Sequence, residues 1–63
     1  MKPHESTQQP GLWFWAEKDS GPVPCWIVYS QASGFPGTEA CDDWFYKFED
    51  ADQVARLLAE GKL

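Results

Sequence analysis

The segment Leu12–Ala16, LWFWA, is apolar at every position, and this feature constrains the fold more than any other. Successive side chains of a β-strand point to opposite faces of a sheet, so this strand would be apolar on both faces. The chain has 63 residues, and a domain of that size buries only about 60% of the surface that its unfolded chain exposes. Such a chain has few elements to cover two faces, so the segment raises the question of what covers the second one.

The pattern of apolar residues and turn residues predicts one folded domain. Residues 1–11 are polar and contain two prolines, and we expect them to be a flexible N-terminal tail. Residues 12–63 form a single small α+β domain. Three strands are predicted, at Leu12–Lys18, Cys25–Gln31 and Trp44–Glu49. The turn at Gly21-Pro22 makes the first two an antiparallel hairpin, and the connection 32–43 is expected to hold a turn or an irregular edge.

The C-terminal part of the chain predicts a helix over Ala51–Glu60. Asp50 is a good N-cap, and Gln53 follows at the spacing of a capping box. Gly61 lies where a left-handed residue would end the helix. The apolar stripe of this helix comprises Ala51, Val54, Ala55, Leu57 and Leu58. The predicted fold is therefore α+β: a three-stranded antiparallel meander with one C-terminal helix packed on one face, in the order β-β-β-α.

One helix of this length, about 15 Å, covers a single face of three strands. We expect it to cover Leu12, Phe14 and Ala16 of the first strand, together with Trp44, Tyr46 and Phe48 of the third. The middle strand has two alternative inward sets, Cys25, Ile27 and Tyr29 or Trp26, Val28 and Ser30. The first is favoured because it turns the polar Ser30 outward. The other face then carries Trp13 and Trp15, with Trp26 and Phe45 as further candidates. Three coverings are open: the tail or the 32–43 connection, a second copy of the chain in a homodimer, or a different partner.

The charge of the chain limits the classes of partner. Ten acidic against five basic residues give a formal net charge of −5 and a pI near 4.5. This argues against direct nucleic-acid binding and against anionic membranes, because both need Lys and Arg. It favours solubility or a basic partner. The sequence has neither the apolar run of a secretory signal nor one that spans a bilayer, so we expect a cytoplasmic protein in which Cys25 and Cys41 are free thiols.

Six of the acidic residues fall within positions 39–52, against one base, Lys47. Several have ordinary structural explanations, because Asp50 caps the predicted helix and Asp52 suits its positive end. Carboxylates two residues apart on a strand lie about 6.6–6.8 Å from each other, a spacing similar to that of phosphates along a nucleic acid. The alternative interpretation is thus a negative stripe that occupies a basic groove. The predicted partner-binding residues are Glu39, Asp42, Asp43, Glu49, Asp52, Trp13 and Trp15.

The sequence shows no pattern typical of catalysis, cofactor binding or a metal site. His4 is the single histidine and lies in the predicted tail, so it is poorly placed as a base for either cysteine. The spacing of His4, Cys25 and Cys41 does not match a zinc site. We therefore expect no enzyme activity, no cofactor and no metal.

As a class, a small, acidic, aromatic-rich domain of this kind resembles the inhibitors that phages and mobile elements carry. The resemblance rests on size and charge. It implies a non-enzymatic protein that blocks a basic, nucleic-acid-binding surface of a host protein or ribonucleoprotein complex, by nucleic-acid mimicry or steric block. An anti-CRISPR protein is one example, acting in the host cell cytoplasm if phage-encoded. The alternatives are a self-associating structural or regulatory module that uses the aromatic sheet face, and a small ligand binder that stacks a sugar on its Trp rings.

Overall fold

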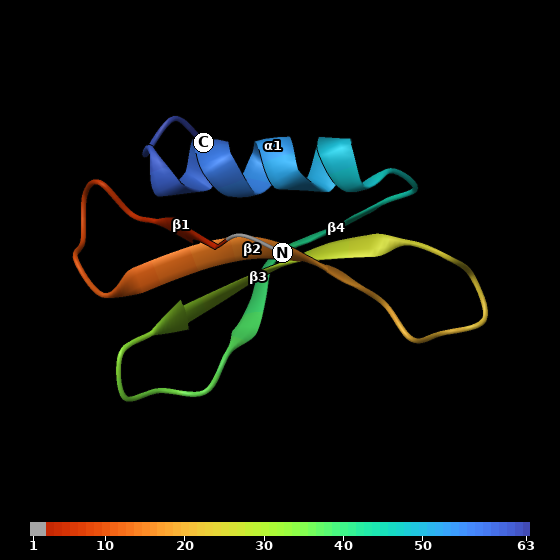
Figure 1. Cartoon of the computed structure of the whole chain (residues 1–63), viewed down its shortest axis with the longest axis horizontal. Helices are drawn as coiled ribbons and strands as arrows, with labels where there is room; N and C mark the ends of the chain where they lie inside the picture. The colour runs from red at the N-terminus through yellow and green to blue at the C-terminus, as the bar shows by residue number, and fades with distance from the viewer. Residues whose placement is uncertain (1–2) are drawn as a thin grey trace.

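A computed structural model describes residues 3–63, which form four antiparallel strands and one helix (Figure 1). The elements are β1 (His4–Glu5), β2 (Leu12–Lys18), β3 (Trp26–Ala32), β4 (Thr38–Phe45) and α1 (Phe48–Ala59). The sheet order is β1-β2-β3-β4, so each strand pairs with its neighbours in the sequence. The predicted α+β class, with an antiparallel sheet and a C-terminal helix, is confirmed. The predicted number of strands is wrong, because the described residues form four rather than three.

The additional strand, β1, lies within the segment expected to be a tail, of which residues 1 and 2 fall outside the described residues. His4 pairs with Phe14 and Glu5 with Trp13. The buried Ser6 then turns the chain, because its hydroxyl oxygen accepts hydrogen bonds from the backbone N–H groups of residues 8 and 9 at 3.1 and 3.0 Å. This strand has only two residues, so it is too short to show the alternation of apolar and polar residues by which a strand is recognised in a sequence.

The last strand, β4, begins and ends earlier than predicted. The expected strand Trp44–Glu49 overlaps β4 only at Trp44 and Phe45. These two residues pair with Ile27 and Trp26, but further along β3 the register shifts through an irregularity. The chain leaves the sheet after Phe45 because Phe48 belongs to the helix, where its ring meets Trp26 edge-on at a centroid distance of 5.0 Å.

The helix also begins earlier than predicted. Lys47 is the N-cap, and no side chain caps the helix there. The predicted capping box of Asp50 and Gln53 is therefore wrong: Asp50 lies in the first turn, where its charge still favours the helix dipole. The predicted C-terminus is confirmed. Gly61 has φ 73°, and the backbone bonds from residues 61 and 62 to the carbonyls of residues 58 and 57 form a Schellman motif.

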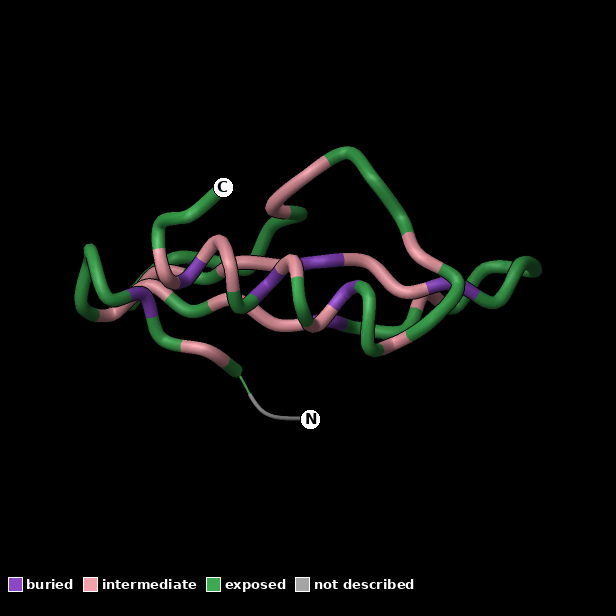
Figure 2. The backbone as a smooth tube through the Cα atoms, turned by 90° about the horizontal axis from the view of Figure 1, so that it is seen from above, coloured by how far each residue is buried: buried purple, intermediate pink, exposed green. Residues whose placement is uncertain are grey.

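The core lies between α1 and the sheet. Three buried alanines of α1, Ala51, Ala55 and Ala59, face the sheet. Their small side chains let the helix lie close to Ala16 and Val28, which are 1% and 0% exposed. Figure 2 shows short buried stretches spread along the length of the molecule, with longer exposed stretches between and beyond them.

The structure confirms some predicted side-chain directions and corrects others. As expected, Phe14 and Ala16 of β2 face α1. The expected inward set of the middle strand is wrong, because β3 turns Trp26 and Val28 to the helix instead of Ile27 and Tyr29. The positions of four aromatic residues are also corrected: Trp26 and Phe45 pack towards α1, whereas Trp44 and Tyr46 do not. The pairing of β2 with β3 sets the side-chain directions of β3. Ala16 faces the helix and lies opposite Val28, so Val28 faces the helix too.

Candidate open-face binding surface

Among residues 3–63, no helix or further sheet covers the face of the sheet opposite α1 (Figure 1). Residues that lie opposite each other in an antiparallel pair share a face, so the register assigns nine strand positions to this side. We call them the open face: Glu5, Trp13, Trp15, Glu17, Ile27, Tyr29, Gln31, Glu39 and Trp44. Four of the nine are aromatic, and every strand contributes at least one position.

Aromatic rings form the floor of the open face. The Trp15 and Tyr29 rings stack across β2 and β3, with centroids 6.1 Å apart and planes 19° apart. The Trp15 indole Nε1–H donates to the Glu17 carboxylate at 3.2 Å, which fixes the orientation of the ring. Trp13 and Trp44 remain 39% and 53% exposed. The two indoles that the sequence predicted to be free of the helix, Trp13 and Trp15, thus lie together on this face.

The β3–β4 connection and Pro3, which precedes β1, border the indoles without closing over them. Gly37, in the β3–β4 connection, lies so near the Trp15 ring that a Cβ atom there would be 3.6 Å from it. Pro3 lies beside a hollow of about 340 Å³, which is also lined by Trp13, Trp15 and Gln31. The expectation that the tail or the 32–43 connection covers the face therefore accounts for only its border.

The charge of the open face is negative. Glu5, Glu17 and Glu39 occupy three of its nine positions, and none of the nine is Lys or Arg. Burial, followed by the nearby charges of Glu39, Glu17 and Asp19, raises the pKa of Tyr29. The neutral phenol is preferred there because a phenolate would lose water and meet three carboxylates. The aromatic floor therefore has a negative electrostatic potential.

The structure divides the predicted partner-binding residues between two sides of the molecule. Trp13, Trp15 and Glu39 lie on the open face. Asp42 and Asp43 are exposed on the edge strand β4. The other two, Glu49 and Asp52, lie on α1, and the Asp52 carboxylate accepts a hydrogen bond from His4 Nε2 at 2.8 Å. The acidic residues of positions 39–52 do not form one continuous stripe.

Sequence reasoning missed Glu5, Ile27, Tyr29 and Trp44 as members of the surface. Glu5 was assigned to a tail and Tyr29 to the opposite face. The alternation of Trp26, Val28 and Ser30 against Ile27, Tyr29 and Gln31 gives two nearly equivalent faces, and only pairing with Ala16 distinguishes them. The small side chain of Ala16 allows a close approach of the helix. Ala16 was therefore the residue in the sequence that could have indicated which face of β2, and of the strand paired with it, lies against the helix.

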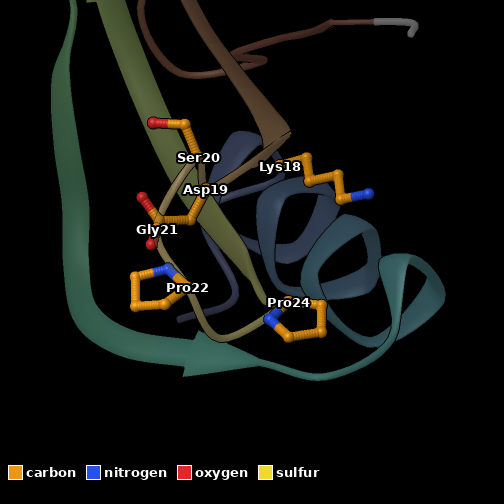
Figure 3. Close-up of a pocket in the computed structure, with 6 residues that line it drawn as sticks. All are labelled: Lys18, Asp19, Ser20, Gly21, Pro22 and Pro24. Atoms are coloured by element: carbon orange, nitrogen blue, oxygen red, sulfur yellow. The ribbon is translucent and has the colours of Figure 1, made fainter.

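Another hollow, of about 500 Å³, lies in the β2–β3 connection rather than on the open face (Figure 3). The Lys18 amine and the Asp19 carboxylate point in different directions there, so they do not converge on one ligand. Cys25, at the end of this connection, is a buried free thiol. Its pKa is raised by burial and by the neighbouring Asp19 carboxylate, so it is a poor nucleophile at neutral pH.

Two further observations concern metal binding and membrane-spanning helices. Within residues 3–63, no group of three His, Cys, Asp or Glu side chains is arranged to hold a metal ion. Over the same residues, no helix has both the length and the apolar character needed to cross a bilayer.

A scan against protein-family models, a search of curated proteins and a search of solved structures each gave no match to this chain. The function must therefore be argued from the surface itself.

Proposed function

We propose that this chain is a small non-enzymatic binding protein that docks its open face on a basic surface of a partner protein. The observation that carries the proposal is an aromatic floor within a set of carboxylates, formed by the exposed Trp13 and the half-buried Trp15 and Tyr29. Exposed aromatic residues are the usual anchors of protein interfaces. Surrounding carboxylates steer such a surface towards Lys and Arg and raise the association rate.

The charge also separates this function from self-association. Pairing two open faces in a homodimer would bring Glu5, Glu17 and Glu39 of one copy close to the same residues of the other. Like charges at an interface cost free energy unless they are neutralised. A basic partner provides that neutralisation, so a heterologous complex is favoured over a homodimer.

The biological role that fits this surface is inhibition by occlusion. A phage- or mobile-element-type inhibitor in the cytoplasm that covers the nucleic-acid-binding surface of a host complex, as an anti-CRISPR protein does, would need a compact acidic domain with a firm apolar contact. Steric block is favoured over phosphate mimicry, because the acids of positions 39–52 lie on two sides of the molecule. The open face supplies the apolar contact.

The test is affinity capture from a lysate of the source cell, followed by binding measurements on the purified partner. The double variant W13A/W15A should weaken binding about 1,000-fold, because two central aromatic anchors at about 2 kcal/mol each contribute about 4 kcal/mol together. Leu63→Ala is the matched control: Leu63 is 69% exposed and lies beyond α1. Far-UV circular dichroism verifies that each variant is folded.

The charge contribution is tested separately with E17K/E39K. This variant should slow association about tenfold and reduce its dependence on salt. Glu49→Lys, on α1, changes the net charge by half as much and is the control for a charge reversal away from the open face. If the W13A/W15A and E17K/E39K variants bind the partner as the wild type does, the open face is not the binding surface.

A further inference from the structure

A second hollow lies at the end of the open face, between the β2–β3 connection and the end of β4. Its volume is about 410 Å³, within the range of side-chain and small-ligand pockets. Trp44 and Tyr46 form one wall, with ring centroids 4.9 Å apart and planes at 82°. Both rings are more than half exposed, at 53% and 69%, so the wall is accessible from solvent.

The rest of the lining combines apolar groups with one carboxylate. Val23 and Ile27 supply aliphatic surface, and Asp19 supplies the acid. Figure 3 shows the Asp19 carboxylate and the Pro22 ring on the side of the loop nearer β4, with the Lys18 amine on the other side. Within residues 3–63, no Lys or Arg forms an ion pair with Asp19. Its carboxylate therefore has no cation to neutralise it in this part of the chain.

The Asp19 carboxylate is held in place by its surroundings. The Cys25 Sγ–H donates to Asp19 Oδ2 at 3.7 Å, and the Asp19 backbone N–H donates to the Cys25 carbonyl at 2.9 Å. These two contacts close the loop and fix the acid at the rim of the hollow. The acid is half-buried, so its interaction with a cation is screened less than that of a surface carboxylate.

We propose that this hollow binds an arginine side chain of the basic partner, with its guanidinium group between the Trp44–Tyr46 pair and the Asp19 carboxylate. Rings at right angles present π faces to one cation from two directions. The guanidinium group stacks on aromatic faces and pairs bidentately with a carboxylate. The aliphatic stem of arginine packs on Val23 and Ile27.

Two arguments favour arginine over other occupants. A neutral apolar side chain would leave Asp19 desolvated without a partner, which costs free energy. A lysine ammonium is a compact, strongly hydrated charge that neither stacks nor pairs bidentately. The inference rests on the proposed function for the identity of the partner surface, but the pocket itself is tested without the partner.

The test is an NMR titration of the whole chain with the tripeptide amide acetyl-Gly-Arg-Gly, observed through the Trp indole N–H signals. The matched peptides carry citrulline, which keeps the shape without the charge, or lysine. We expect the Trp44 signal to shift with the arginine peptide. The citrulline peptide should bind at least about tenfold more weakly, because it loses a charge-assisted hydrogen bond, and lysine should fall between them.

Two variants locate the effect. Asp19→Asn should weaken arginine binding about tenfold, whereas Asp42→Asn, which removes the same charge from β4, should change it less than twofold. Tyr46→Leu should also weaken binding, with the Trp44 signal as reporter. The Trp26 indole, which packs on Phe48, shows in the same spectra whether each variant is folded. Equal binding of the citrulline and arginine peptides, or shifts at Trp13 and Trp15 alone, would overturn the inference.

The outcome separates this inference from the proposed function. If the Trp44 signal does not respond but W13A/W15A abolishes partner binding, the arginine pocket is wrong and the open-face interface stands. If the Trp44 signal responds and W13A/W15A has no effect on the partner, the pocket stands and the interface must be placed elsewhere.

Discussion

The His4 Nε2 atom lies 2.8 Å from the Asp52 Oδ1 atom, which joins the first strand to the middle of the helix across 48 positions of sequence. A second contact lies near the end of α1, where the Thr7 backbone N–H donates to the Ala59 carbonyl at 2.8 Å. The N-terminal segment therefore contacts the helix at two points and satisfies one of the carbonyls that a helix leaves free at its end. This arrangement makes residues 4–7 part of the folded unit.

Removing the His4–Asp52 contact should destabilise the protein modestly. We expect His4→Ala to lower the free energy of unfolding by about 0.5–1 kcal/mol, because both side chains are partly exposed and the pair is screened by water. Chemical denaturation measures this, and a double-mutant cycle with Asp52→Ala isolates the pair. Gln53→Ala, an exposed neighbour on α1, is the control. Additive effects of the two substitutions would show that the contact contributes nothing.

The close approach of α1 to the sheet predicts sensitivity to volume at Ala55. Ala55 is 0% exposed, so Ala55→Leu should force the helix away from Ala16 and Val28 and lower the free energy of unfolding by about 1–3 kcal/mol. In a domain this small, each kcal/mol lowers Tm by about 4–8 °C. Gln53→Leu makes the same kind of addition on the exposed side of the helix. Equal Tm values for the two variants would contradict the tight packing at Ala55.

The elements that the sequence predicted well are those with a local physical cause. Leu12–Lys18 is a strand as expected, because its aromatic and apolar residues suit a pleated surface. Gly61 ends the helix, because only glycine readily adopts its positive φ. The outward direction of Trp13 and Trp15 followed from Glu17, which shares their side of the strand. Each of these inferences needs only neighbouring residues.

The features that were missed depend on contacts between distant residues. Asp50 has a strong local preference for an N-cap, but burial of the Phe48 ring against Trp26 extends the helix past it. The middle strand has apolar residues on both faces, so its direction depends on its partner strand. The grouping of Glu5, Glu17 and Glu39 on one surface likewise follows from strand pairing, and no stretch of sequence brings them together.

The two free thiols should differ in reactivity. Cys25 is buried and its pKa is raised by burial and by Asp19, whereas Cys41 is half-buried on β4. Only the thiolate reacts, so iodoacetamide at neutral pH should alkylate Cys41 about tenfold faster than Cys25. Mass spectrometry of peptides cleaved after glutamate measures both rates, because Glu39 lies between the two cysteines. In Asp19→Asn the Cys25 rate should rise, because the nearby negative charge is gone, and an unchanged rate would leave burial as the single cause.

The charge of the open face should appear in the titration of Tyr29. Burial is the first cause of its raised pKa, and Glu39, Glu17 and Asp19 add to it. The double variant E17Q/E39Q should therefore lower the pKa of Tyr29 without returning it to its ordinary value, since burial remains. NMR of tyrosine ring carbons during a pH titration follows Tyr29 separately from Tyr46. Glu49→Gln, on α1, removes a charge from the other side of the sheet and should leave the titration of Tyr29 nearly unchanged.

The same shift makes the stability of the protein depend on alkaline pH. The phenol of Tyr29 has a higher pKa in the folded than in the unfolded chain, so its contribution to stability is complete below the unfolded value of about 10. As the pH rises above that value, Tyr29 of the unfolded chain loses its proton before Tyr29 of the folded chain does. Its contribution to the stability of the fold therefore falls progressively until the pH has passed the folded-state pKa. In E17Q/E39Q the folded and unfolded pKa values are closer, so the loss of stability above about pH 10 should be smaller than in the wild type. Denaturation midpoints measured on both sides of that pH test this, and an equal or steeper decline in the variant would mean that these two carboxylates do not act on Tyr29.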